Sequence, residues 1–330
     1  MNGLLKYFKA ALLLSGAFAA AHPLAAQPVA SDQEAFGAEI EVIGRRQTEP
    51  EVREQAFDYV RRSGVIKGDS PIARWHQPVC LKIIGAKPDY ARVVEHKFRA
   101  IATIAEVELA TGRCKPNVVI AFTTNGKRVA QEIIKREPQQ INEVPLPDRR
   151  MVIEGDAAVR WWYTTQLATS EGMITGLDGI AIADYGSSEG GGSVVSDKYP
   201  MVRVYHSSLI RTSVMRVLRS ATIVIDVNQA NGMSLDAVAA YATLVGLAEI
   251  APIRMQPPNS ILGLFGPDAT VASATDWDIS FLKGLYAIPP ARFGWKQKKM
   301  LANHLVRSAD AAGQIIDEGQ LNAVLEETNR

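Results

Sequence analysis

The chain has 330 residues, with 36 Lys and Arg against 35 Asp and Glu and a formal net charge of +1. This balance provides no basic field that would attract nucleic acid or an anionic membrane, so we expect no nucleic-acid partner. Hydrophobic residues make up 47% of the chain, which is typical of a globular protein and enough to bury a large core.

Residues 1–26 have the pattern of a secretory signal peptide. Lys6 and Lys9 form a short positive region, residues 10–21 form an apolar run too short to span a bilayer, and small residues precede Gln27. We therefore expect cleavage after Ala26 and a mature protein that is periplasmic or secreted. No later stretch is long and apolar enough to predict a transmembrane segment.

Residues 27–48 are polar and lack a sustained period, which predicts a flexible N-terminal arm. Within this arm, residues 39–46 alternate apolar and acidic side chains and end in a basic pair. That pattern resembles the short box by which outer-membrane transporters engage the energy-transducing TonB protein. An accessory role in TonB-linked outer-membrane uptake is therefore one alternative function, and an edge strand or a solvated arm is the simpler interpretation of the segment.

Residues 49–330 are predicted to form a single α+β domain, in which a mixed sheet carries packed helices. In the first half, apolar spacing, prolines and glycines predict a helix over 50–62 ended by Gly64, followed by a strand pair or one long bent strand over 72–84. A helix is then expected from Pro88 and is closed by Gly112. A strand over 117–123 in the middle of the sheet and a helix over 126–137 complete this half.

Cys80 and Cys114 are the two cysteines of the chain. In an exported protein, two cysteines without a third predict one disulfide. A structural zinc site would need further cysteine or histidine ligands close to them, and the sequence has none there.

The second half begins with less regular sequence over 138–200, where Trp161, Trp162 and Tyr163 are predicted to lie in or beside a strand. Residues 186–193 are glycine-rich and predict a surface loop. No helix pattern follows this loop, which argues against phosphate binding. The remaining predicted elements are strands over 201–205 and 221–227, a helix capped by Ser234 and running to about Ile250, a helix over 276–286, and a last helix from Trp295.

The familiar catalytic motifs do not occur in the chain. It has neither the His-Glu-x-x-His helix of zinc peptidases nor the Gly-x-Ser-x-Gly turn of serine hydrolases, and the sequence therefore predicts no catalytic residue, metal or cofactor. The acidic pairs Glu154/Asp156 and Asp276/Asp278 leave a hydrolase with a carboxylate-based site as an alternative. Four histidines remain after the signal, and they are far apart in the sequence: His76, His96, His206 and His304.

Several aromatic and histidine positions are candidates for ligand contact, because tryptophan stacks on many ligand classes. Trp75 is one of them. Trp161 and Trp162 are neighbours on a predicted strand and should point to opposite faces, so one of the two is expected at the surface. His206 follows a strand and is the histidine in the least ordinary setting. Tyr241, on the helix after Ser234, completes the set.

Arg74-Trp75, Cys80, Cys114, residues 160–163 and the block 221–286 together resemble a family of uncharacterised secreted proteins of alphaproteobacteria. The same block also resembles, more distantly, domains related to zincin metallopeptidases. That resemblance matches the strand 220–227, the helix 235–250, the pair Ser260-Ile261 and the helix from Asp276 to Tyr286.

A zincin carries its two zinc-binding histidines and its glutamate on the first of these helices, where this chain has only small and apolar residues around Tyr241. The resemblance therefore implies a pseudoenzyme: a peptidase-like scaffold that has lost its metal.

Together these observations predict a non-catalytic exported protein that binds a peptide, a protein or another cell-envelope component. An open cleft lined by tryptophan and backbone edges would favour this prediction. Clustered carboxylates, or a histidine beside an acid, would favour the hydrolase.

Overall fold

The computed structural model describes residues 47–316, apart from 66–67, 170–171, 174–180, 185–200, 205–210, 253–254, 268 and 270. The predicted signal peptide, the segment 39–46, the glycine-rich loop 186–193 and His206 lie outside the described residues. Of the predicted arm, only Gln47 and Thr48 are described.

The helices are α1 (Glu49–Ser63), α2 (Pro88–Ile104), α3 (Gly126–Arg136), α4 (Leu146–Glu154), α5 (Leu235–Leu247), α6 (Asp276–Ala287) and α7 (Gly294–Ala311), with 3-10 turns at Pro138–Ile141 and Ile261–Gly263. The strands are β1 (Gln47–Thr48), β2 (Leu81–Ile84), β3 (Val118–Thr123), β4 (Val159–Thr169), β5 (Ala181–Asp184), β6 (Met201–Val204), β7 (Val214–Asp226) and β8 (Ile315–Ile316). None of the helices within these ranges combines the length and hydropathy needed to cross a bilayer.

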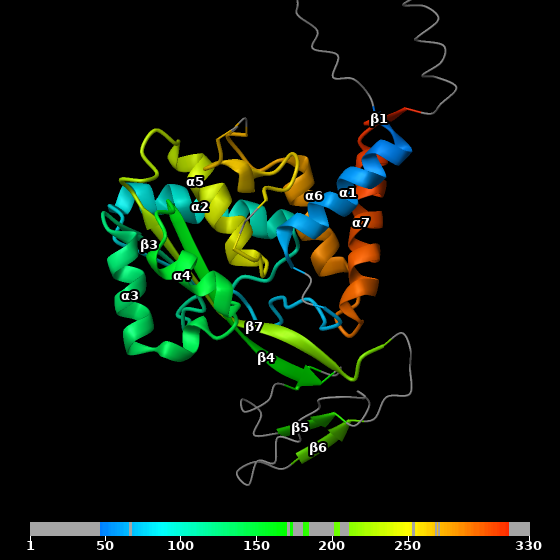
Figure 1. Cartoon of the computed structure of the whole chain (residues 1–330), viewed down its shortest axis with the longest axis horizontal. Coiled ribbons are helices and arrows are strands. Elements are labelled where there is room, and N and C mark those ends of the chain that lie inside the picture. Colours follow the sequence, from blue (N-terminus) through cyan, green and yellow to red (C-terminus); the bar gives the residue numbers. More distant parts are fainter. Residues whose placement is uncertain are drawn as a thin grey trace, which may run out of the picture. The chain divides into compact units, whose positions relative to one another are not determined.

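A four-stranded mixed sheet with the order β2-β3-β7-β4 forms the centre of the fold (Figure 1). The first three strands are parallel, and β4 runs antiparallel to β7 at one edge. The predicted α+β class is therefore confirmed. The strand expected in the middle of the sheet is β3, which pairs with β2 on one side and β7 on the other. Two short parallel pairs, β1-β8 and β5-β6, form separate two-stranded sheets.

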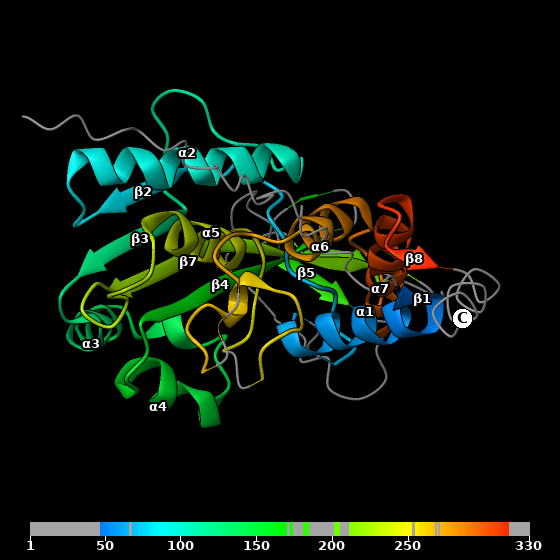
Figure 2. The ribbon, with the colours of Figure 1, turned by 90° about the horizontal axis from the view of Figure 1, so that it is seen from above.

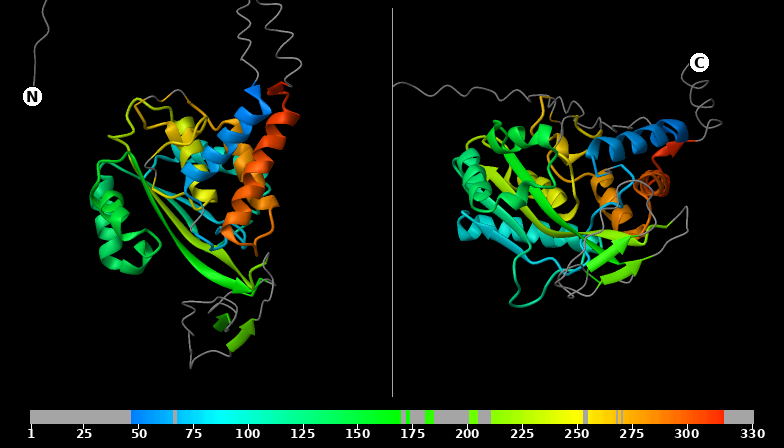
Figure 3. Two further views of the ribbon diagram at one scale, coloured as in Figure 1. Left: turned by 45° about the vertical axis from the view of Figure 1, so that its right-hand side comes forward. Right: turned by 60° about the horizontal axis from the view of Figure 1, so that its bottom comes forward.

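Helices cover both faces of the sheet, as Figure 2 and Figure 3 show for α2 and α5 on one side and α3 on the other. Side chains alternate along β7, so Ile223 and Ile225 belong to the larger core beneath α2 and α5, while Val224 belongs to a smaller core beneath α3 and α4. The larger core continues under α1, α6 and α7. The sheet therefore has no face that is open to solvent along its central strands.

Helix α5 is buried on all sides, and every residue from Ala237 to Leu247 is buried. The Ser234 hydroxyl accepts the Ala237 N–H at 3.1 Å and caps the helix as predicted. A β-carbon at Gly246 would lie 3.2 Å from Phe98, so this glycine permits close packing between α5 and α2. A helix so uniformly apolar is stable only inside the protein.

Of two predicted helix ends, the one at Gly64 is confirmed and the one at Gly112 is wrong. Helix α1 ends at Gly64, as predicted, in the left-handed conformation with φ of 65°. The prediction that Gly112 closes the next helix is wrong, because α2 ends at Ile104. Glu106 takes a φ of 58° there, and the Val107 N–H donates to the Ala102 carbonyl at 2.9 Å, which forms a Schellman end on a residue other than glycine.

The predicted disulfide between Cys80 and Cys114 is present. It joins the residue before β2 to the loop between α2 and β3, across a sequence separation of 34 residues. In the chain-entropy account, closing a loop of this length stabilises the folded chain by about 3–4 kcal/mol. The disulfide therefore ties the edge strand β2 to the loop that leads into the central strand.

Three sequence-based boundaries change in the structure. The predicted strand over 72–84 is regular only in β2, and Arg74 and Val79 form isolated bridges ahead of it. Strand β7 begins at Val214, well before the predicted start at 221. The region expected to be irregular after residue 138 contains α4 and the 11-residue strand β4, because segments without a clear helix or strand period gain their structure from packing on the sheet.

Candidate functional site: an aromatic cavity beside strand β4

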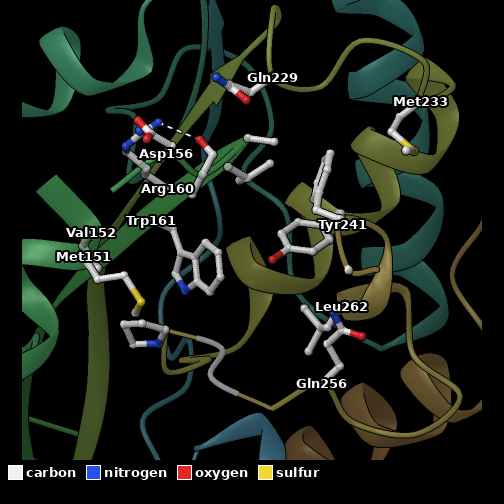
Figure 4. A pocket seen from close by; sticks show the side chains of 16 residues that line it. Met151, Val152, Asp156, Arg160, Trp161, Gln229, Met233, Tyr241, Gln256 and Leu262 are labelled. Carbon is white, nitrogen blue, oxygen red and sulfur yellow. Dashed lines mark hydrogen bonds between the residues drawn. The ribbon is translucent and has the colours of Figure 1, made fainter. Parts of the chain in front are cut away.

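A cavity of about 470 Å³ lies where β4 begins, between α4, α5 and the loop that follows α5 (Figure 4). Its lining is mainly aromatic, aliphatic and thioether, with a few polar side chains. The residues are Met151, Val152, Asp156, Ala157, Ala158, Val159, Arg160, Trp161, Gln229, Met233, Tyr241, Pro252, Gln256, Leu262, Phe265 and Gly266. This mixture of apolar surface and sparse polar groups is typical of small ligand-binding sites.

Three aromatic rings form one side of the cavity. The rings of Trp161 and Tyr241 meet edge to face with centroids 5.9 Å apart, and those of Tyr241 and Phe265 do the same at 5.2 Å. The indole N–H of Trp161 donates to the Ile250 carbonyl at 2.8 Å, which holds its ring in place. These rings come from β4, α5 and the loop after the second 3-10 turn, so only the tertiary fold brings them together.

Tyr241 brings an available polar group to the cavity. Among the described residues its hydroxyl has no hydrogen-bond partner, and Figure 4 shows it pointing toward Trp161. Burial raises the pKa of this phenol above its ordinary value of 10. The hydroxyl therefore stays protonated at neutral pH and is able to donate a hydrogen bond to a bound group.

Arg160 lies with Asp156 at the end of the cavity away from Tyr241. Its guanidinium donates to the carbonyls of Ala157, at 2.7 Å, and Gly155, so it holds the turn that leads into β4. Desolvation lowers the pKa of Arg160, while the nearby charges of Asp226 and Asp156 raise it. Arg160 is 3% exposed, and its hydrogen bonds to these two carbonyls give the guanidinium a positioning role at this end of the cavity.

The lining residues limit the chemistry that this cavity offers. Among the described lining residues there is no serine, threonine, cysteine, histidine or lysine, and the ionisable side chains there are those of Asp156, Arg160 and Tyr241. The cavity is instead equipped for apolar contact and hydrogen bonding. Within the described part of the chain, no group of three or more histidine, cysteine, aspartate or glutamate side chains is arranged to hold a metal ion.

The candidate ligand-contact residues separate into different parts of the structure. Trp161 and Tyr241, 80 positions apart in the sequence, meet in the cavity. Trp75 is buried elsewhere and donates to the Gly246 carbonyl at 2.9 Å. Trp162 points to the opposite face of the sheet and donates to Gln140 at 2.9 Å. His206 lies outside the described residues.

The expectation that Trp161 or Trp162 reaches the surface is wrong. They point to opposite faces as predicted, but they are 7% and 1% exposed. Helix α5 covers the face of Trp161, and α3 and α4 cover the face of Trp162. A strand covered on both faces buries both members of an adjacent pair.

The two acidic pairs lie in different surroundings. Asp276 is exposed at the start of α6, while Asp278 is buried and receives hydrogen bonds from Tyr59 and Ser260. Burial raises the pKa of Asp278, and the hydrogen bonds that it accepts partly oppose this shift. Glu154 is exposed on α4, and Asp156 is also exposed and lines the cavity.

Sequence reasoning did not identify several residues of the cavity. Met151 lies on α4, a helix that the pattern did not predict, and Phe265 and Gln256 belong to a loop without a recognisable motif. The weak signals available were a proline near the start of α4 and an isolated phenylalanine in a glycine-rich loop. Neither specifies a site until the loop is seen to pack beside α5.

Comparisons of the chain with protein-family models, with curated proteins and with solved structures found no match. The resemblance to secreted alphaproteobacterial proteins and to zincin-related domains therefore stays a prediction.

Proposed function

We propose that this chain is an exported, non-catalytic binding protein that takes a peptide segment of another envelope protein into the cavity beside β4. The observation that carries the proposal is the cavity itself, in which Trp161, Tyr241 and Phe265 offer ring surface next to an available phenol hydroxyl. An apolar side chain fits such a lining, and the polar groups suit the amides of a peptide.

Peptide binding is tested with fluorescein-labelled seven-residue peptides that carry one variable residue between threonine and serine flanks. The variable residue is phenylalanine, tryptophan, leucine, lysine, glutamate or glycine. Fluorescence anisotropy is expected to show the aromatic and leucine peptides binding at least about tenfold more tightly than the glycine peptide, because a large apolar side chain leaves water. If none of the six peptides binds, the proposed function is wrong.

Filling the cavity provides the matched test. Met151 lines the cavity on α4, and Met151→Trp is expected to weaken binding of the phenylalanine peptide by at least about tenfold because the larger ring occupies the space. The control is Leu146→Trp on the same helix, where the side chain is 76% exposed and does not line the cavity. Equal peptide affinities for the two variants would place binding elsewhere.

Export is the second part of the proposal, and the Cys80–Cys114 disulfide supports it because such bonds persist in oxidising compartments. After expression of the full chain in a Gram-negative host, mass spectrometry of the periplasmic fraction is expected to find a mature N-terminus at Gln27 and a disulfide-linked pair of cysteine peptides. An uncut N-terminus on soluble protein, or two free thiols in that fraction, would contradict this expectation.

A further inference from the structure

The outer edge of β4 borders the cavity with backbone groups that β7 does not use. The Asp226 N–H donates to the Ala158 carbonyl at 2.8 Å, and these residues lie one position beyond Val159 and Ile225, the opposite pair at which the register of the two strands begins. In antiparallel pairs, residues that bond to the partner strand alternate with residues that direct their N–H and C=O groups away from it. Val159 and Trp161 therefore direct their backbone groups outward.

These outward groups have no partner within the described part of the chain. Strand β4 is the last strand in the order β2-β3-β7-β4, and no hydrogen bond joins the outer backbone groups of Val159 or Trp161 to another described residue. The two residues are only 5% and 7% exposed, yet both line the cavity. Backbone amides that are largely buried are nearly always paired in folded proteins, so this edge is suited to an added partner.

The cavity continues around both sides of this edge. One wall comes from α4, whose Val152 packs in the core beneath α3 and α4. The opposite wall comes from Tyr241 and Phe265, which pack in or against the core beneath α5. A strand laid along β4 would lie between the two walls and direct alternate side chains toward one and then the other. The walls thus match the period of an extended chain.

We propose that a segment of another protein binds here in extended conformation, as a fifth strand beside β4 that pairs with Val159 and Trp161. This inference rests on the proposed function and adds the mode of recognition. The backbone of the segment supplies amides for the open edge, and one apolar side chain, aromatic or aliphatic, lies against Trp161, Tyr241 and Phe265. Main-chain pairing provides affinity, and the aromatic wall provides selectivity for that side chain.

The test is an N-methyl scan of the phenylalanine peptide described above, measured by anisotropy on the full-length processed protein. N-methylation removes one amide hydrogen and adds bulk at that position. Added-strand pairing predicts an alternating pattern, in which methylation at every second residue near the phenylalanine weakens binding about tenfold or more and methylation between them weakens it less than about threefold.

A protein variant tests the same contact from the other side. Val159→Pro removes the outward N–H at the first residue of β4, a position where proline is compatible with a strand. We expect this variant to bind the phenylalanine peptide about tenfold or more weakly than the wild-type protein does. Circular dichroism checks that this variant folds, and the N-methyl scan on the wild-type protein decides the question if it does not.

The outcomes separate the two proposals. Peptide binding with a uniform N-methyl profile would overturn the added strand and leave the proposed function in place. No binding by any of the six peptides would overturn both. Self-association of the protein through β4, seen as a concentration-dependent dimer that Val159→Pro abolishes, would replace the partner segment by a second copy and also overturn this inference.

Discussion

Replacement of Asp278 by alanine is expected to lower the free energy of unfolding by about 3–5 kcal/mol, because it leaves several buried donors without an acceptor. The carboxylate is 1% exposed. It accepts the hydroxyl hydrogens of Tyr59 and Ser260, each at 2.6 Å, and the backbone N–H groups of Ile261 and Thr275, each at 2.9 Å. One side chain thus joins α1, the 3-10 turn after α5, and the first turn of α6.

Urea denaturation followed by circular dichroism measures this loss. The matched control is Asp276→Ala in the same helical turn, which removes an exposed acid and is expected to cost less than about 1 kcal/mol. Tyr59→Phe removes one of the donors, and its loss in free energy of unfolding is expected to lie between those of the two aspartate variants, at about 1 kcal/mol. If Asp278→Ala and Asp276→Ala have the same midpoint, the buried carboxylate does not stabilise the junction of α1 and α6.

Glu249→Ala is expected to cost about 3–5 kcal/mol for a related reason: it leaves a buried arginine charge without its main partner. The Arg216 guanidinium donates to both carboxylate oxygens of Glu249, at 2.9 and 3.0 Å, and their side chains are 9% and 1% exposed. Glu143, which is 31% exposed, is a further acceptor at 3.1 Å. This cluster links β7 to the segment after α5.

Urea denaturation followed by circular dichroism also measures the loss in Glu249→Ala, and two further variants serve as controls. The double variant Arg216→Met/Glu249→Leu removes both charges at similar volume, and its free energy of unfolding is expected to lie within about 2 kcal/mol of the wild-type value. Glu95→Ala, which breaks an exposed pair with Arg99 on α2, is expected to cost less than about 0.5 kcal/mol. A double variant no more stable than Glu249→Ala would mean that shape, and not charge, is decisive at this site.

Local patterns were sufficient for a substantial part of the fold. Ser234 and Gly64 define helix ends through their own backbone and hydroxyl chemistry, and the structure has both ends where they were predicted. The β-branched run in β3 indicated a strand covered on both faces, and the cysteine count indicated one disulfide. Each of these depends on a few neighbouring residues or on composition, so no knowledge of distant packing was needed.

The candidate site was only partly within reach of such patterns. Trp161 and Tyr241 were both among the predicted ligand-contact residues, but nothing in the sequence indicated that they meet. The prediction that one tryptophan of the pair is exposed was wrong because α3 and α4 cover the face of the sheet that Trp162 occupies. The end of α2 was misplaced because Glu106 accepts a left-handed conformation that is more common for glycine.

The amino-acid sequence by itself determined which segments are apolar enough to be buried, where several helices begin and end, and which cysteines pair. The tertiary structure alone decided that β4 is an edge strand among the described strands, that Val159 and Trp161 line a cavity, and that Phe265 joins Tyr241 in its wall. The physical reason is that burial and helix ends follow from local energetics. Strand order and cavity shape depend instead on contacts between residues far apart in the chain.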